Sequence, residues 1–186
     1  MRRSDLPATT SLAGSILLAH PSLRDPNFRR SVVLLSAHDE EGAMGVVVNR
    51  PLQQTLADLD EAFGASALAK VPVYAGGPVQ AKQVILCGWR FTGLDNTFRL
   101  HFGLLPERAE ELMQEEGLQL RAFLGYSGWS AGQLENELRQ DTWLVSAIPA
   151  NFMTFHPDDT LWRGLVGGLN HQWKVLADEP DDPSLN

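Results

Sequence analysis

Short apolar runs separated by polar or glycine-containing turns fill the first half of the chain, and this pattern is typical of β-strands. Three runs rich in Val, Ile and Leu lie at residues 15–19, 31–36 and 43–49. The polar segment AHDEEG joins the last two runs and has the length of a hairpin loop. We expect further strands at residues 71–74, 83–89, 98–102, 118–124 and 142–147.

Helical patterns appear between the later strands. Residues 55–63 predict a short helix with Thr55 as its N-cap and Asp58 in the capping-box position. Residues 106–116 predict a second helix, because a proline stands in the first turn and acidic residues follow it. Two more helices are expected at 131–140, after a glycine-rich turn, and from Asp158 or Asp159 to about residue 165, with a further apolar segment ending near 177.

The order of these elements predicts the fold class. Short loops between the early strands favour antiparallel pairing, whereas the later strand–helix–strand segments favour parallel crossover connections. We therefore expect a single α+β domain over residues 12–177, with a mixed, largely antiparallel sheet, open or barrel-like, flanked by helices. Residues 1–11 and the acidic, proline-containing stretch 178–186 are expected to be disordered tails.

Charge narrows the range of partners. The net charge is −8; residues 1–100 hold 10 basic and 9 acidic side chains, and residues 101–186 hold 5 and 14. An acidic half repels phosphate backbones, so we do not expect direct nucleic-acid binding, and no basic stripe suggests a membrane surface. The single cysteine, Cys87, lies in an apolar strand and is expected to be buried and inert.

The N-terminus bears on location. A basic start followed by the apolar residues 12–19 has the order of a signal peptide. Polar residues interrupt it, however, and residues 12–19 also predict the first strand. We therefore expect a cytoplasmic protein.

The segment 120–140 carries the motif G-x-S-x-G at residues 128–132, with an apolar strand before it and an amphipathic helix after it. This is the setting of a nucleophile elbow, which would make Ser130 a catalytic nucleophile. The plainer interpretation is a packed strand-to-helix junction in which Ser130 is the N-cap and Gln133 completes a capping box. A hydrolase would also need an acid and a base downstream, for which the candidates are Glu135, Asp158, His156 and His171.

Two other clusters could bind a ligand. His38 lies among carboxylates in the hairpin loop, where a solvated turn is the simpler interpretation, and Asn49-Arg50 could bind an anion or could pair with a structural carboxylate. Gly76 and Gly77 allow either a close approach to a ligand or a tight turn, and the turn is favoured. The histidine spacing matches no zinc motif, so no metal or other cofactor is expected.

Taken together, three segments resemble the AlgH/YqgE family of bacterial proteins. They are GSILLAHPSLRDPNFRRSVVLLSAHDEEGAMGVVVNRP at 14–51, YAGGPV at 74–79 and GYSGWSAGQLENELRQDTWLV at 125–145. The resemblance covers about residues 12–177 and implies one α+β domain in the bacterial cytoplasm. Family members are often described as transcriptional regulators because of genetic context, and no established reaction, cofactor or catalytic residue accompanies the name. The resemblance also implies variation at two serines, with Ala often at the position of Ser127 and Gly or Ser at that of Ser130, and we expect a histidine in many relatives at the position of Cys87.

These observations lead to a hypothesis about function. We expect a regulatory or binding module that acts through a small ligand or a protein partner, with a serine-dependent hydrolase or transferase as the alternative. Its site is expected where the hairpin end, the Gly76-Gly77 turn and the 125–133 segment meet. The side chains expected to contribute are His38, Asn49, Arg50, Tyr126, Trp129 and Gln133. The oligomeric state is left open.

Overall fold

The computed structural model describes residues 10–93, 97–152, 156–169 and 171–178. Nine strands of these residues form one sheet, and its strands are numbered in chain order. They are β1 (Ile16–Ala19), β2 (Val32–Asp39), β3 (Gly42–Val47), β4 (Pro51–Thr55), β5 (Pro72–Ala75), β6 (Val79–Thr92), β7 (Thr97–Leu104), β8 (Gln119–Ser130) and β9 (Trp143–Ser146).

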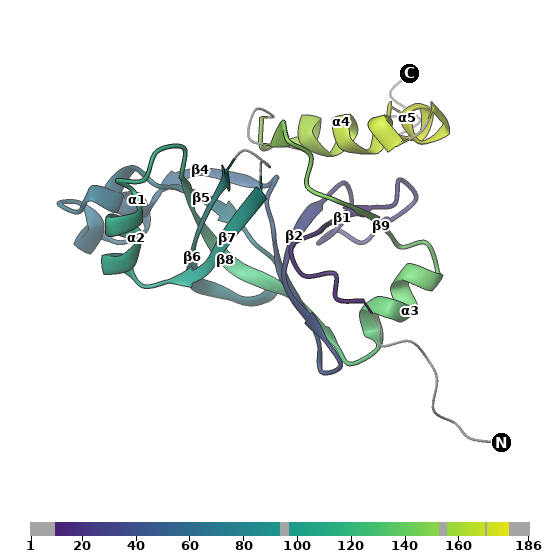
Figure 1. Cartoon of the computed structure of the whole chain (residues 1–186), viewed down its shortest axis with the longest axis horizontal. Helices are drawn as coiled ribbons and strands as arrows, with labels where there is room; N and C mark the ends of the chain where they lie inside the picture. The colour runs from purple at the N-terminus through teal and green to yellow at the C-terminus, as the bar shows by residue number, and fades with distance from the viewer. Residues whose placement is uncertain (1–9, 94–96, 153–155, 170, 179–186) are drawn as a thin grey trace.

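The sheet is mixed but largely antiparallel, as predicted. Its strand order is β4-β5-β8-β3-β2-β1-β9, and β6 pairs with both β8 and β7. Among the described strands, β5 and β8 form the parallel pair, and the other pairs are antiparallel. β8 is the junction of the sheet, because its first half lies between β5 and β6 and its second half pairs with β3. The sheet curls into a half-barrel (Figure 1).

Helices cover the two ends of this sheet differently (Figure 1). Helices α1 and α2 gather at the β4–β5 end, α3 lies near the other end, and α4 and α5 run across the top of the view. Their bounds are α1 (Leu56–Leu59), α2 (Pro106–Leu112), α3 (Gln133–Arg139), α4 (Asp159–Leu169) and α5 (His171–Asp178), with 3-10 turns η1 (Glu61–Phe63) and η2 (Ala67–Lys70).

Three apolar clusters hold these layers together. The first joins the sheet to α4, through residues such as Trp89, Phe123 and Trp162. The second packs β1, β2 and β3 against α3, where Leu134 is buried. The third lies under α1, η2 and α2. Burial of this apolar surface, rather than a disulfide, stabilises the fold, and Cys87 is a buried free thiol as predicted.

The largest departure from the predicted elements concerns β8. We expected a strand ending at residue 124 and a turn over 125–133, but the strand continues to Ser130 and the turn is confined to Ala131 and Gly132. The glycines misled the prediction, because they serve close strand packing here. Gly125, with φ of +69°, follows the last residue of β8 that pairs with β5, and the pairing with β3 begins two residues later, at Ser127.

Several local predictions are confirmed. Thr55 and Asp58 form the capping box of α1, although that helix ends at Leu59 and continues only as the turn η1. Asp158 caps α4 by accepting hydrogen bonds from the backbone N–H and hydroxyl of Thr160. The prediction missed β4, an edge strand that begins at Pro51.

The predicted tails lie mostly outside the described residues, so their disorder stays a prediction. Of the expected N-terminal tail, Thr10 and Ser11 are described, and the Ser11 hydroxyl donates a hydrogen bond to the His38 carbonyl of β2 at 2.8 Å. Among the described residues, no helix combines the length and the apolar character needed to cross a membrane.

Candidate functional site

A shallow groove lies where the β2–β3 hairpin meets β8 and the start of β6. Its volume is about 380 Å³. The side chains of Met44, Val79 and Tyr126 supply apolar surface, and the carboxylate residues Asp39 and Glu41 stand at the hairpin end. The groove is lined by Ala37, Asp39, Glu41, Gly42, Ala43, Met44, Val79, Tyr126, Gly128 and Trp129.

Gly128 keeps part of this groove open. A Cβ atom added at Gly128 would lie 3.3 Å from Cε2 of Tyr126 and 3.8 Å from Cγ2 of Val79. The half-buried Tyr126 ring therefore lies over a strand position that has no side chain. Tyr126 and Trp129, both predicted as ligand contacts, line the groove together, whereas His38, Asn49, Arg50, Gly76, Gly77 and Gln133 do not line it.

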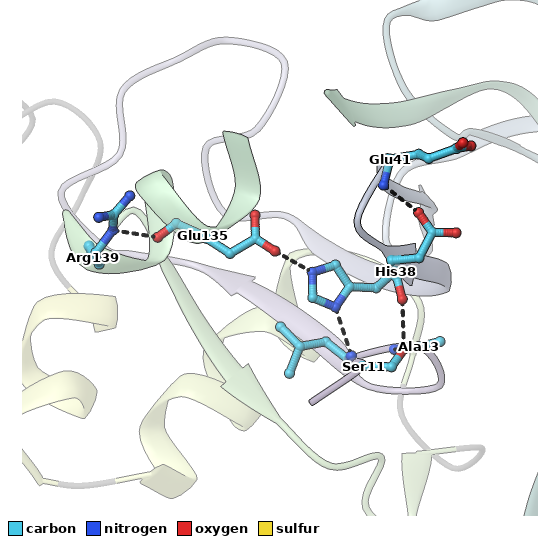
Figure 2. Close-up of polar contacts among 8 residues, drawn as sticks. Ser11, Ala13, His38, Glu41, Glu135 and Arg139 are labelled. Atoms are coloured by element: carbon cyan, nitrogen blue, oxygen red, sulfur yellow. Dashed lines mark hydrogen bonds and ion pairs between the residues drawn. The ribbon is translucent and has the colours of Figure 1, made fainter. Parts of the chain in front are cut away.

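His38 lies behind the groove as a buried structural residue, which corrects the expected solvated turn. It belongs to β2 rather than to the loop, and only 7% of it is exposed. Its Nε2 lies 2.8 Å from Oε1 of Glu135 on α3, and its Nδ1 accepts the backbone N–H of Leu12 at 2.9 Å. Figure 2 shows the imidazole between the helix and the N-terminal segment.

These partners fix the tautomer of the neutral His38 ring. Because Nδ1 accepts a hydrogen bond, the neutral ring carries its proton on Nε2 and donates it to Glu135. Both ring nitrogens are then occupied, so His38 has no free nitrogen for a nucleophile or a metal. The pKa of Glu135 is lowered, first by a hydrogen bond from its own backbone N–H and then by the His38 hydrogen bond. His38 thus ties α3, the hairpin and the chain start together.

A second tie holds α3 to β8 and β9. Oε2 of Glu137 accepts the indole N–H of Trp129 at 2.8 Å and that of Trp143 at 2.7 Å. Phe28 contacts both indole rings. Trp129 and Trp143 are therefore core anchors, and Glu137 is the partner that the sequence did not reveal. Glu137 lies four residues after Gln133, on the same face of α3, and Nε2 of Gln133 donates to its Oε1. This spacing was the sequence feature that could have pointed to Glu137.

Ser130 is exposed, and no general base lies beside it among the described side chains. Its hydroxyl bonds Oε1 of Gln133 at 3.2 Å, and within the described side chains no histidine nitrogen lies at hydrogen-bond distance from it. The side chain of the candidate His171 lies outside the described part. Ser130 is also not the N-cap of α3, since Gly132 takes that position with φ of +72°. Gln133 does reach back to the Ser130 N–H, at 3.1 Å, so half of the predicted capping box exists.

The Gly76-Gly77 pair packs against the backbone of β8. A Cβ atom at Gly76 would lie 2.3 Å from the carbonyl oxygen of Gly125, and one at Gly77 would lie 2.3 Å from the Tyr126 carbonyl. The Gly76 carbonyl accepts hydrogen bonds from Val47 N–H and from the Ser127 hydroxyl. The three predicted segments therefore do meet, but their meeting point is filled with protein.

Asn49 and Arg50 belong to a different surface. Asn49 is buried and connects Val32 N–H to the carbonyls of Arg30 and Asp158. Arg50 donates to the carbonyls of Pro26 and Arg29, at 3.4 and 3.0 Å. The structural carboxylate partner considered for Arg50 is not formed among the described ion pairs. The expected single site is thus divided between the groove and this second surface.

Arg121 is a cation that sequence reasoning missed. Its guanidinium lies over the rings of Tyr74 and Trp89, with centroid distances of 4.8 and 5.0 Å, and it donates to the Val48 carbonyl at 3.3 Å. Burial lowers the pKa of Arg121, and Tyr74 acts in the opposite direction. The sequence feature that could have revealed Arg121 is its position as a single charged residue within an apolar strand. Across the described chain, no group of three potential metal-ligating residues assembles.

Comparison with known proteins agrees with this architecture. The AlgH-like family model matches residues 16–174. UPF0301 proteins from Streptomyces avermitilis and Streptomyces coelicolor are 36% and 37% identical to the chain; each alignment covers 98% of it and all of the relative.

Two solved structures share the fold. The solution structure of the AlgH protein from Pseudomonas aeruginosa matches with a TM-score of 0.65 and 27% identity, over 98% of this chain and 100% of that one. A crystal structure of a Corynebacterium diphtheriae protein matches with a TM-score of 0.67 and 23% identity, over 96% and 95% of the two chains. The sequence match over most of the chain, together with these structures, shows that the protein belongs to the AlgH-like family.

Proposed function

We propose that this protein is a binding module that recognises a partner protein through the groove between the β2–β3 hairpin and β8. The observation that carries the proposal is the make-up of the groove: an apolar floor of Met44, Val79 and Tyr126 beside the exposed carboxylate residues Asp39 and Glu41. Its volume of about 380 Å³ is within the usual range of ligand sites. The complementary occupant is a short segment with both apolar and basic side chains.

The rigid frame of the groove supports this proposal. His38 and Glu137 fix the hairpin and the end of β8 to α3, so the walls are held by buried hydrogen bonds. A preorganised surface loses little conformational entropy when a partner binds. The hydroxyl of Ser130 bonds Gln133, and none of the described side chains is placed to act as its general base. This surface therefore gives no support to a hydrolase.

A regulatory role would then be indirect. With a net charge of −8, the protein would be repelled by a DNA backbone, so any effect on transcription would pass through a protein partner. We place this interaction in the cytoplasm.

The test is a titration of the ¹⁵N-labelled full chain with two peptides of equal length. One alternates leucine with arginine, and the other replaces each arginine with glutamate. We expect the basic peptide to shift amide signals of residues 37–44, 79 and 126–129, and the acidic peptide to leave them in place. The double variant Asp39→Asn, Glu41→Gln should weaken the binding of the basic peptide several-fold, because its charge partners are removed.

A matched control removes two carboxylates elsewhere. Glu107→Gln with Glu111→Gln changes the charge equally on α2, outside the groove, and should leave binding unchanged. Gly128→Leu should also abolish binding, because the new side chain would occupy the space beside Tyr126 and Val79. Equal shifts with both peptides, or equal weakening in the control variant, would disprove recognition by the groove.

A further inference from the structure

The first described residues of the chain are anchored beside the groove. Nδ1 of His38 accepts the Leu12 N–H at 2.9 Å, and the Ser11 hydroxyl donates to the His38 carbonyl at 2.8 Å (Figure 2). His38 directly precedes Asp39, which lines the groove. These two hydrogen bonds therefore place Ser11 next to the hairpin that forms one wall of the groove.

The residues before this anchor are numerous enough to reach the groove. Residues 1–9 lie outside the described part and are joined to Ser11 through Thr10. Nine residues span up to about 30 Å when extended. The strands β2, β3 and β8 are neighbours in the sheet, and with a spacing of about 4.8 Å they extend over about 10 Å. A segment attached at the edge of β2 can therefore cover the groove.

The composition of residues 1–9, MRRSDLPAT, complements the groove. Arg2 and Arg3 are basic, Met1 and Leu6 are large and apolar, and Asp5 is the single acidic residue. The groove combines an apolar floor with exposed carboxylates at the hairpin end. Apolar side chains of the segment can cover the floor while its two guanidinium groups approach the carboxylates.

The carboxylates of the hairpin end have no cationic partner among the described ion pairs. Asp39, Glu40 and Glu41 are exposed, and the described ion pairs join other residues. Oδ1 of Asp39 accepts the Glu41 N–H at 2.9 Å, which orders the turn without neutralising it. Three neighbouring like charges repel one another, so a basic segment beside them is stabilised.

We propose that residues 1–9 occupy the groove and compete with its partner protein. This inference rests on the proposed function, and it adds a means of regulation to the same site. Because the segment is attached through Ser11, it competes at an effective concentration in the millimolar range. A partner must displace it, so the groove is filled only above a threshold concentration of the partner.

The first experiment measures this competition with the basic leucine–arginine peptide. A variant that lacks residues 2–9 should bind the peptide about tenfold more tightly than the full chain. That factor corresponds to a segment that fills the groove about nine-tenths of the time. Arg2→Gln with Arg3→Gln should give most of the gain. Arg24→Gln with Lys70→Gln is the matched control, because it removes two exposed charges outside the groove and should leave the affinity unchanged.

The second experiment locates the segment directly. A nitroxide spin label is attached at Ser4→Cys in the ¹⁵N-labelled chain, where the buried Cys87 thiol is not expected to react. We expect the label to broaden the amide signals of residues 39–44 and 126–129. The double variant Asp39→Asn, Glu41→Gln should remove this broadening. A mixture of spin-labelled ¹⁴N chain and unlabelled ¹⁵N chain should show none, because the contact lies within one molecule.

Three results would overturn the inference. They are an unchanged peptide affinity after the deletion, broadening confined to residues outside the groove, and broadening in the mixture, which would mean that a second copy is the occupant. An equal gain in the Arg24, Lys70 control would likewise replace the segment by a general effect of charge. If no peptide binds even to the shortened chain, the proposed function fails, and the spin label alone decides whether the segment lies in the groove.

Discussion

The Cys87 thiol lies in β6 with none of its surface exposed, among the aromatic side chains of the first apolar cluster. Burial raises its pKa to about 12, and a backbone hydrogen bond with Gly103 acts in the opposite direction. The nucleophilic thiolate is thus suppressed at neutral pH. We expect no rapid reaction of the native protein with a disulfide reagent at pH 8, and one reactive thiol per chain in denaturant. A full, fast reaction of the native protein would contradict this.

Glu135 makes stability depend on pH at the acid end. Its pKa in the folded protein is below the ordinary value of 4.5, mainly because its own backbone N–H and then His38 stabilise the carboxylate. A lowered folded pKa contributes stability above the unfolded pKa, and that contribution is lost as pH falls through the folded pKa. The difference in unfolding free energy between the unmodified chain and Glu135→Gln should therefore shrink below about pH 4.5.

Urea denaturation at a series of pH values measures this difference. Glu40→Gln is the control, because it removes the same charge from the exposed hairpin loop. A constant difference between the unmodified chain and Glu135→Gln from pH 7 to pH 3 would show that the Glu135 contacts do not stabilise the carboxylate.

At the scale of elements, the Glu137 carboxylate joins α3 to the strands β8 and β9. Glu137→Ala leaves the indole N–H groups of Trp129 and Trp143, both nearly buried, without their acceptor. We expect a loss of about 2 kcal/mol or more in unfolding free energy, measured by urea denaturation followed by circular dichroism. Glu111→Ala breaks an exposed pair on α2 and should cost less than about 1 kcal/mol. Equal losses would contradict the role of Glu137.

The contact between the β5–β6 turn and β8 depends on the absence of side chains. Gly76→Ala would place a methyl group 2.3 Å from the Gly125 carbonyl oxygen, and neither backbone can move without breaking sheet hydrogen bonds. We expect the variant to lose about 3 kcal/mol or more, or to become insoluble. Gly168→Ala in α4 meets no atom within 4 Å and should stabilise the helix by up to about 1 kcal/mol. Thermal unfolding of both variants checks the opposite signs.

The success of sequence reasoning also differs from element to element. β1 and β2 were predicted because they contain runs of Val, Ile and Leu that bury both faces, and the caps of α1 and α4 follow from local hydrogen bonding. The extension of β8 was missed because its glycines are explained only by neighbours distant in sequence. His38 was misplaced for the same reason: its partners, Leu12 and Glu135, are 26 and 97 residues away. Tyr126 and Trp129 were predicted as groove residues, whereas Asp39, Glu41, Met44 and Val79 were not.

At the scale of the whole molecule, charge decides the expected response to DNA. The net charge of −8 is concentrated in the second half of the chain, which holds 5 basic and 14 acidic side chains. We expect no binding of a labelled DNA duplex at about 0.15 M salt, measured by fluorescence anisotropy. Binding that persists at this salt concentration would require a direct role in DNA recognition.

The central position of β8 also has a consequence for synthesis of the chain. Its three partners, β3, β5 and β6, all precede it in sequence, so they leave the ribosome before the strand that joins them. Until residues 119–130 arrive, those strands present unpaired edges, the feature that most favours association with other chains. Premature termination before residue 119 should therefore yield aggregating fragments rather than a smaller folded protein.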